Sequence, residues 1–209
     1  MKGEQIMYYR WMKYWLGLII MGMGVSLVVS ANLGTDPIST IILGVANAGG
    51  LSFGIASQIL LIIVVAIVYF IDKSRLKVGT LVHAIASGSI IGLCLKLQIT
   101  TEHLPIRISL LVSGAIVLSV GIAIYISSSL GEGAFDALMM GVHNRFGLNV
   151  GVVRVFQDVV LTAIGFILGA KVGVGSIFMV LVTGHMIGFA LNGISVIENR
   201  KKKTAGFAG

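Results

Sequence analysis

The sequence consists of two copies of one unit, and this duplication limits the fold to two similar halves. When the chain is aligned with itself at an offset of 97 residues, glycines of the first half coincide with glycines of the second. Gly17 pairs with Gly114 in this way, and near the end of the unit the offset becomes 96, as for Gly88 and Gly184. A single deletion in a loop explains the change. An ordered series of matches over the whole chain is typical of an internal repeat.

The closest agreement between the copies lies at residues 44–54 and 141–151. These stretches read GVANAGGLSFG and GVHNRFGLNVG, and six of the eleven positions are identical. Glycine lets helices approach each other closely in a membrane. We therefore predict structural roles for the repeated glycines, which are Gly34, Gly44, Gly54, Gly131, Gly141 and Gly151.

Each copy contains four apolar segments. They span 14–31, 38–48, 53–71 and 78–95 in the first copy, and 108–127, 134–146, 152–170 and 174–193 in the second. Three of the four approach the roughly 20 residues that a helix needs to cross a bilayer, whereas the second is short enough to be a re-entrant half-helix. Only 11% of the residues are charged, against about 25% in soluble domains. We predict an all-α polytopic membrane protein whose environment is the lipid bilayer.

The repeat also predicts the division of the chain. We assign residues 1–98 to the first membrane repeat, 99–196 to the second, and 197–209 to a basic cytoplasmic tail. The basic start followed by an apolar run resembles a secretory signal. Because that run has a counterpart in the second copy, we predict that it is a retained first span.

Three spans per copy is an odd number, so the second copy would enter the bilayer inverted relative to the first. With a cytoplasmic N-terminus, six spans place twelve cationic residues inside and three outside. If the short segments also cross, the result is eight spans, parallel repeats, and a split of eleven to four. Both arrangements place the excess of positive charge inside. The length of the short segments favours six spans, with both termini cytoplasmic.

One candidate for the functional site is the pair Arg154 and Asp158, which opens the third long segment of the second copy. At this spacing the two side chains lie on one face of a helix, within reach of each other. Charged side chains at membrane depth are costly and need a partner or a role. The pair is either a charged gate or substrate counter-ion, or a neutralised pair that joins neighbouring helices.

Acidic residues also begin both short segments. Asp36 precedes Pro37, which is typical of a helix N-cap followed by the first helical residue. Glu132 and Asp136 would favour the positive end of a helix dipole. Capping is one interpretation of these carboxylates. The other is a substrate or ion pathway, because transporters with inverted repeats place such sites at interrupted helices.

The sequence lacks the common catalytic patterns H-E-x-x-H, G-x-S-x-G, C-x-x-C and the Walker loop. Cys94 is the only cysteine. We therefore expect no enzyme activity, no cofactor and no metal. The net charge of +7 lies in connectors and tails, where it would face cytoplasm and anionic lipid rather than nucleic acid.

Over most of its length, from Trp15 to Leu191, the chain resembles the bacterial YczE/YyaS/YitT group of integral membrane proteins, and it is most similar to the YczE-like branch. The motifs that carry the resemblance are Ala31-Asn32-Leu33-Gly34-x-x-Pro37, Leu130-Gly131-x-Gly133-x-x-Asp136 and Arg154-x-x-x-Asp158. The resemblance implies a location in the bacterial cell membrane and makes Asp136, Arg154 and Asp158 the first positions to test. The chain departs from the Pro-x-Asp pattern of the group at Ser39 and Ala134.

The leading functional hypothesis is a small-solute transporter or permease with a site near the membrane midplane, at the interface of two inverted repeats. A channel is the first alternative, because paired half-helices also line selective pores. A scaffold or regulatory partner that transports nothing is the second. The sequence does not name the solute or coupling ion, and it leaves a homo-oligomer open.

Overall fold

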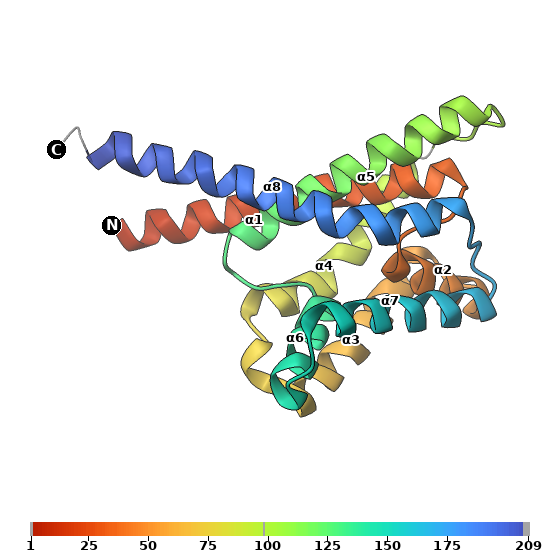
Figure 1. Ribbon diagram of the computed structural model, residues 1–209, viewed down its shortest axis with the longest axis horizontal. Coiled ribbons are helices and arrows are strands. Elements are labelled where there is room, and N and C mark those ends of the chain that lie inside the picture. The colour runs from red at the N-terminus through yellow and green to blue at the C-terminus, as the bar shows by residue number, and fades with distance from the viewer. Residues whose placement is uncertain (1, 98, 207–209) are drawn as a thin grey trace.

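The computed structural model describes residues 2–97 and 99–206, with side chains at 4–97 and 99–198. Within these ranges the chain forms eight α-helices, one short 3-10 helix and no strand (Figure 1). The elements are α1 (Lys2–Ala31), α2 (Pro37–Gly49), α3 (Phe53–Asp72), η1 (Lys73–Arg75), α4 (Val78–Leu95), α5 (Leu104–Ser127), α6 (Ala134–Phe146), α7 (Val150–Ile167) and α8 (Val174–Gly206). The predicted all-α fold is confirmed.

In the part of the chain that the structure describes, six helices are long and apolar enough to cross a membrane, namely α1, α3, α4, α5, α7 and α8. In lipid, a chain must satisfy its backbone hydrogen bonds internally, and a helix does so within one segment. Helices α2 and α6 have 13 residues each. Such a helix is about 20 Å long, well short of the roughly 30 Å of hydrocarbon. The prediction of three long helices and one short helix in each copy is confirmed.

The first and last helices are longer than predicted. Helix α1 begins at Lys2, and α8 continues to Gly206, through most of the segment assigned to a separate tail. Hydropathy marks only the apolar part of a helix, whereas a polar extension can remain helical in water. Both chain ends lie at the same end of the molecule (Figure 1).

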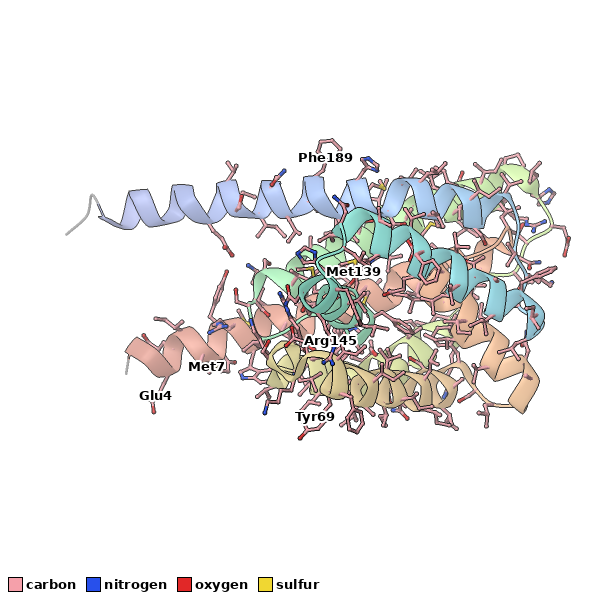
Figure 2. All side chains as sticks on the ribbon, turned by 60° about the horizontal axis from the view of Figure 1, so that its bottom comes forward. Glu4, Met7, Tyr69, Met139, Arg145 and Phe189 are labelled. Carbon is pink, nitrogen blue, oxygen red and sulfur yellow. The ribbon has the colours of Figure 1, made fainter. Side chains whose placement is uncertain are left out.

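The outer surface of the helices is strongly apolar. Phe189 on α8 and Tyr69 on α3 point away from the bundle (Figure 2) and are 77% and 58% exposed. Phe70 beside Tyr69 is 79% exposed. Apolar exposure on this scale is unsuited to water and suited to lipid tails.

An antiparallel pair of helices, α1 and α5, forms the centre of the bundle. Their backbones touch at the repeated glycines. A Cβ atom added to Gly17 would lie 2.5 Å from the backbone nitrogen of Tyr125, and one added to Gly114 would lie 2.8 Å from that of Val28. Glycine at these two positions of the repeat lets the two helices approach each other closely.

The two halves make matching hydrogen bonds where one half meets the other. The Nε atom of Arg10 donates to the carbonyl of Ser128 at 2.7 Å, and the Nε atom of Arg107 donates to that of Ala31 at 2.8 Å. The two hydrogen bonds are equivalent in the repeat, because Arg107 corresponds to Arg10 and Ser128 corresponds to Ala31 at the offset of 97 residues. In both cases a guanidinium binds carbonyl groups at the end of the opposite central helix, where helical partners are lacking.

Asn47 and Asn144 form a second matched set. The side chain of Asn47 donates to the carbonyl of Gly169, and that of Asn144 donates to Asp72, each at 2.9 Å. The first bond joins α2 to the end of α7, and the second joins α6 to the end of α3. The short helix of each copy therefore packs on the third helix of the other copy.

One contact between helices of the first half has no equivalent in the second half. Helix α3 packs along α4, whereas α7 and α8 barely touch. In the first half, a Cβ atom on Gly88 would lie 2.5 Å from the carbonyl oxygen of Gly54. At the corresponding places in the second half, Gly184 has no atom within 4 Å, and Gly151 meets only a nearby side chain of its own copy. The similar halves thus have different internal packing.

Two more of the repeated glycines, Gly34 and Gly131, lie where one copy contacts the other. Gly34 has a positive φ of 105°, and an added Cβ would lie 2.8 Å from the backbone nitrogen of Gly173. An added Cβ on Gly131 would lie 2.6 Å from the backbone nitrogen of Thr80. Both positions therefore require glycine, because backbone from the other copy occupies the space of a side chain.

Candidate functional site

A cavity of about 510 Å³ lies where the starts of α2 and α6 meet α7 and α8. Helix α2 contributes Asp36 and Ser39 at its start, and α6 contributes Gly133 and Asp136 at its start. The short helices begin here for local reasons. Asp36 accepts a hydrogen bond from the backbone nitrogen of Ser39 at 3.0 Å, so the N-cap predicted for this residue is confirmed.

Arg154 of α7 joins two carboxylates in this cavity. Its Nη1 atom lies 2.9 Å from Asp136 Oδ1, and its Nε atom lies 3.1 Å from Asp158 Oδ2. The bond to Asp158 follows from the spacing of the two residues on one helix. The bond to Asp136 links α7 to α6, so the guanidinium also holds the start of the short helix in place.

Two carboxylate oxygens of the cavity have no hydrogen-bond partner among the described residues. These are Oδ1 of Asp36 and Oδ1 of Asp158, and both atoms are buried. Asp158 as a whole is only 6% exposed. Both carboxylates line the same cavity. Leaving a charged oxygen buried and unpaired is costly, so a donor or cation at this point would be favourable.

Further polar side chains line the cavity with buried atoms that lack partners within the described part of the chain. They are Ser57, His83, Ser87 and Thr183. Nothing in the sequence singles out the three hydroxyl residues, and a lone histidine such as His83 on an apolar helix is more often a packing residue than a proton carrier. Only the neighbouring glycines hint at Ser57 and Ser87, since each lies within three residues of Gly54 or Gly88.

Tyr125 is a lining residue that the sequence analysis missed. It lies on the central helix α5, and its ring centroid is 5.4 Å from that of His83. A Cβ atom on Gly133 would lie 3.2 Å from the Tyr125 hydroxyl and 3.3 Å from Asp136 Oδ2. The absence of a side chain at Gly133 therefore leaves room for these polar groups to converge.

Glu132 is the one candidate that does not line the cavity. Its carboxylate lies 3.8 Å from Arg75 Nη1, in a separate depression that also contains Lys77 and Gly131. Partial burial raises the pKa of the Glu132 carboxyl, and the positive charge of Arg75 opposes that effect. The residue precedes α6, and its side chain turns toward the connector between α3 and α4. The other four candidates, Asp36, Asp136, Arg154 and Asp158, line one cavity.

The cavity is acidic and has mostly apolar walls. Its three carboxylates and one guanidinium give a net charge of −2 when all are ionised. The apolar walls include Leu61, Ile91, Leu118 and Met179. Among the described residues, no three His, Cys, Asp or Glu side chains are grouped so that they could hold a metal ion. The arrangement suits the binding of a molecule with a polar head and an apolar body.

Comparison with known proteins places this chain in a family. Residues 8–192 match a family model described as a family of unknown function, DUF6198. The chain belongs to this family. The match includes every residue of the cavity and both short helices.

Similar proteins occur in Haemophilus influenzae and Bacillus subtilis. An uncharacterised protein of Haemophilus influenzae is 32% identical over 175 residues, which is 84% of this chain and 80% of that protein. The uncharacterised membrane protein YczE of Bacillus subtilis is 28% identical over 192 residues, covering 91% of this chain and 88% of YczE. The uncharacterised protein YyaS of the same organism is 22% identical over 181 residues, covering 85% and 90%.

No solved structure matches the chain. The predicted relation to YczE and YyaS is confirmed, whereas the relation to YitT stays a prediction. The similarity to YczE and the six long apolar helices together identify a multi-pass membrane protein embedded in a lipid bilayer.

Proposed function

We propose that this protein is a small-solute transporter rather than an enzyme. In this proposal its two halves are inverted repeats, and the cavity is a midplane site that each half can open in turn. One observation carries the proposal: the starts of both short helices meet in a cavity that extends between α7 and α8, the helices whose packing is not matched. Transporters with inverted repeats place substrate sites at such helix starts.

The antiparallel α1–α5 pair and the matched hydrogen bonds of Arg10 and Arg107 support an inverted arrangement. Packed helices can have two arrangements that differ by only a few kcal/mol, and the two halves share the repeated glycines at these helices. The first half has its third and fourth helices together, and the second half has them apart. Because the halves would run in opposite directions, an exchange of these two arrangements would change the side from which the cavity is reached.

A hydrogen bond between Gln58 and Ser89 marks the closed arrangement of the first half, in which α3 and α4 pack against each other. The Nε2 atom of Gln58 lies 2.8 Å from Ser89 Oγ, which joins α3 to α4. The corresponding residues of the second half are Val155 and His185, and both are exposed. If the second half closes in the same way, these two positions must come as close to each other as Gln58 and Ser89 are, and cysteines placed there are then candidates for a disulfide, which needs a Cα–Cα distance of about 4.4–6.8 Å.

We expect Gln58→Cys/Ser89→Cys to cross-link rapidly in membranes under mild oxidation, in a Cys94→Ser background. Val155→Cys/His185→Cys should also cross-link, but more slowly, because closure of α7 on α8 is then a minor state. The measurement is the rate of cross-linking on gels. If Val155→Cys/His185→Cys stays uncross-linked after the first pair is complete, the second half does not close and alternating access is wrong.

Transport itself is tested in proteoliposomes. A screen of solutes should give saturable uptake with the wild type and reduced uptake with Asp136→Asn, which removes one of the charges held by Arg154. Unitary currents in electrical recordings would instead indicate a channel, since a transporter turns over too slowly to produce them. Absence of any solute-dependent uptake, with no difference in Asp136→Asn, would contradict the proposal.

A further inference from the structure

The cavity at the starts of the short helices has more negative charge than its own residues neutralise. Among the described residues that line it, Arg154 is the one with a permanent positive charge, and that guanidinium already binds both Asp136 and Asp158. Asp36 makes no ion pair within the described part of the chain. A ligand that enters this cavity therefore meets more carboxylates than cations. The guanidinium that it meets is already bound to two of those carboxylates.

The buried oxygen atoms of the cavity that have no partner among the described residues can all accept a hydrogen bond. Oδ1 of Asp158, in a side chain that is almost fully buried, and Oδ1 of Asp36 can only accept hydrogen bonds when ionised. The hydroxyls of Ser57 and Ser87, on residues that are 0% and 1% exposed, can accept as well. An ammonium group supplies several N–H donors and a positive charge, and so satisfies both requirements.

The size and walls of the cavity define the rest of the ligand. A volume of about 510 Å³ lies within the range of about 300–1,000 Å³ found for small-molecule sites. A bare inorganic cation or a proton would neutralise the charge but leave most of that space unfilled. The apolar side chains of Ile91, Leu118 and Met179 favour a hydrocarbon or aromatic body in contact with them.

We propose that the cavity binds an organic cation, with an ammonium group beside Asp36 and Asp158 and an apolar body against the walls formed by α4, α5 and α8. This inference rests on the proposed function, since it names the class of solute that the same cavity takes. An anion would meet net repulsion, and a neutral analogue would leave the carboxylates unpaired. Charge therefore decides the specificity, while the walls contribute affinity for any apolar body.

Three compounds with the same body and different head groups test the proposal: 4-phenylbutylamine, 4-phenylbutanol and 4-phenylbutyrate. At pH 7 the amine is protonated, since alkyl ammonium groups have pKa values of about 10. Binding to purified protein in lipid nanodiscs is measured by calorimetry, with empty nanodiscs subtracted to remove partitioning into lipid. We expect the amine to bind about tenfold or more tightly than the alcohol, and the butyrate to bind least.

Asp36→Asn is the decisive variant, because asparagine caps a helix as well as aspartate does. It should weaken binding of the amine about tenfold and leave that of the alcohol within about twofold. Asp158→Asn should act in the same direction. Glu102→Gln is the matched control, because it removes one carboxylate from an exposed loop outside the cavity.

Butyrate binding as tight as amine binding would overturn the inference, and so would unchanged amine binding in both aspartate variants. Failure here is distinguishable from failure of the transport proposal. Cross-linking of Val155→Cys/His185→Cys requires no ligand, so it can succeed when the amine does not bind. Conversely, selective amine binding without uptake into proteoliposomes would overturn transport and leave the specificity of the cavity intact.

Discussion

At the scale of single residues, Arg154 is the organising side chain of the cavity. The sequence predicted its pairing with Asp158, because two residues four apart on a helix face the same way. It did not predict the bond to Asp136, which comes from another helix at 2.9 Å. The guanidinium thus has a structural role, joining α6 to α7, as well as an electrostatic one within the site.

Arg154→Gln should destabilise the protein by about 3 kcal/mol, because it leaves two half-buried or buried carboxylates without a counter-charge. The measurement is thermal or denaturant unfolding in detergent micelles. The double variant Arg154→Gln/Asp136→Asn should recover part of the loss, since one of the two unpaired charges is then removed.

Arg145→Gln is the matched control for this prediction. Arg145 lies at the exposed end of α6, where its side chain makes a long hydrogen bond of 3.3 Å to the carbonyl of Ile71. Its removal should cost less than about 0.5 kcal/mol, as for most surface positions. An equal loss of stability in Arg145→Gln and Arg154→Gln would contradict the role assigned to Arg154.

At the scale of helices, the two short helices differ in how tightly they pack. Gly44 of α2 touches the backbone of α7, where an added Cβ would lie 2.6 Å from the carbonyl oxygen of Gly165. Gly141 occupies the corresponding place on α6, but an added Cβ would lie 3.4 Å from the side chains of Ile71 and Asp72. The sequence treats these two glycines as equivalent, and only the packing distinguishes them.

Gly44→Ala should therefore lower the free energy of unfolding by about 2 kcal/mol, because the methyl group forces two backbones apart. Gly141→Ala should be neutral or slightly stabilising, because its contact is an ordinary one and alanine favours helix by about 1 kcal/mol over glycine. Unfolding in micelles measures both. Similar losses in the two variants would mean that α2 and α6 are packed equally tightly.

At the scale of the whole molecule, the number of spans decides how the two halves face the membrane. With six spans, the connector after α3 and the connector after α7 lie on opposite sides of the bilayer. Lys73 and Lys171 are exposed residues at these two connectors. If the short helices also crossed, both connectors would lie on the same side.

Lys73→Cys and Lys171→Cys, each in a Cys94→Ser background, should be labelled from opposite faces by a membrane-impermeant maleimide. Lys73→Cys should react only after the cells are opened, because the cytoplasmic N-terminus predicted from charge places this connector inside. Lys171→Cys should react on intact cells. Labelling of both from the same face would contradict the inverted arrangement.

The sequence by itself determined the membrane environment, the lengths of the apolar segments and the duplication. These features depend on local composition and on a fixed bilayer thickness, so they can be predicted without knowing how segments meet. The boundaries of α2, α3, α4 and α6 follow the predicted apolar segments within two residues. The polar ends of α1 and α8 were not predicted, since no change in hydropathy marks where they stop being helical.

Only the tertiary structure decided which polar groups share a cavity and where the two halves differ. Asp36 lies about 100 residues before Asp136 and Arg154, which are on the consecutive helices α6 and α7, so the meeting of these three side chains depends on how the two halves pack together. Glu132, four residues before Asp136, turns toward Arg75 instead. The two copies, which share the repeated glycines but few other residues at these helices, also pack differently at α3–α4 and α7–α8, and packed helices can have more than one arrangement.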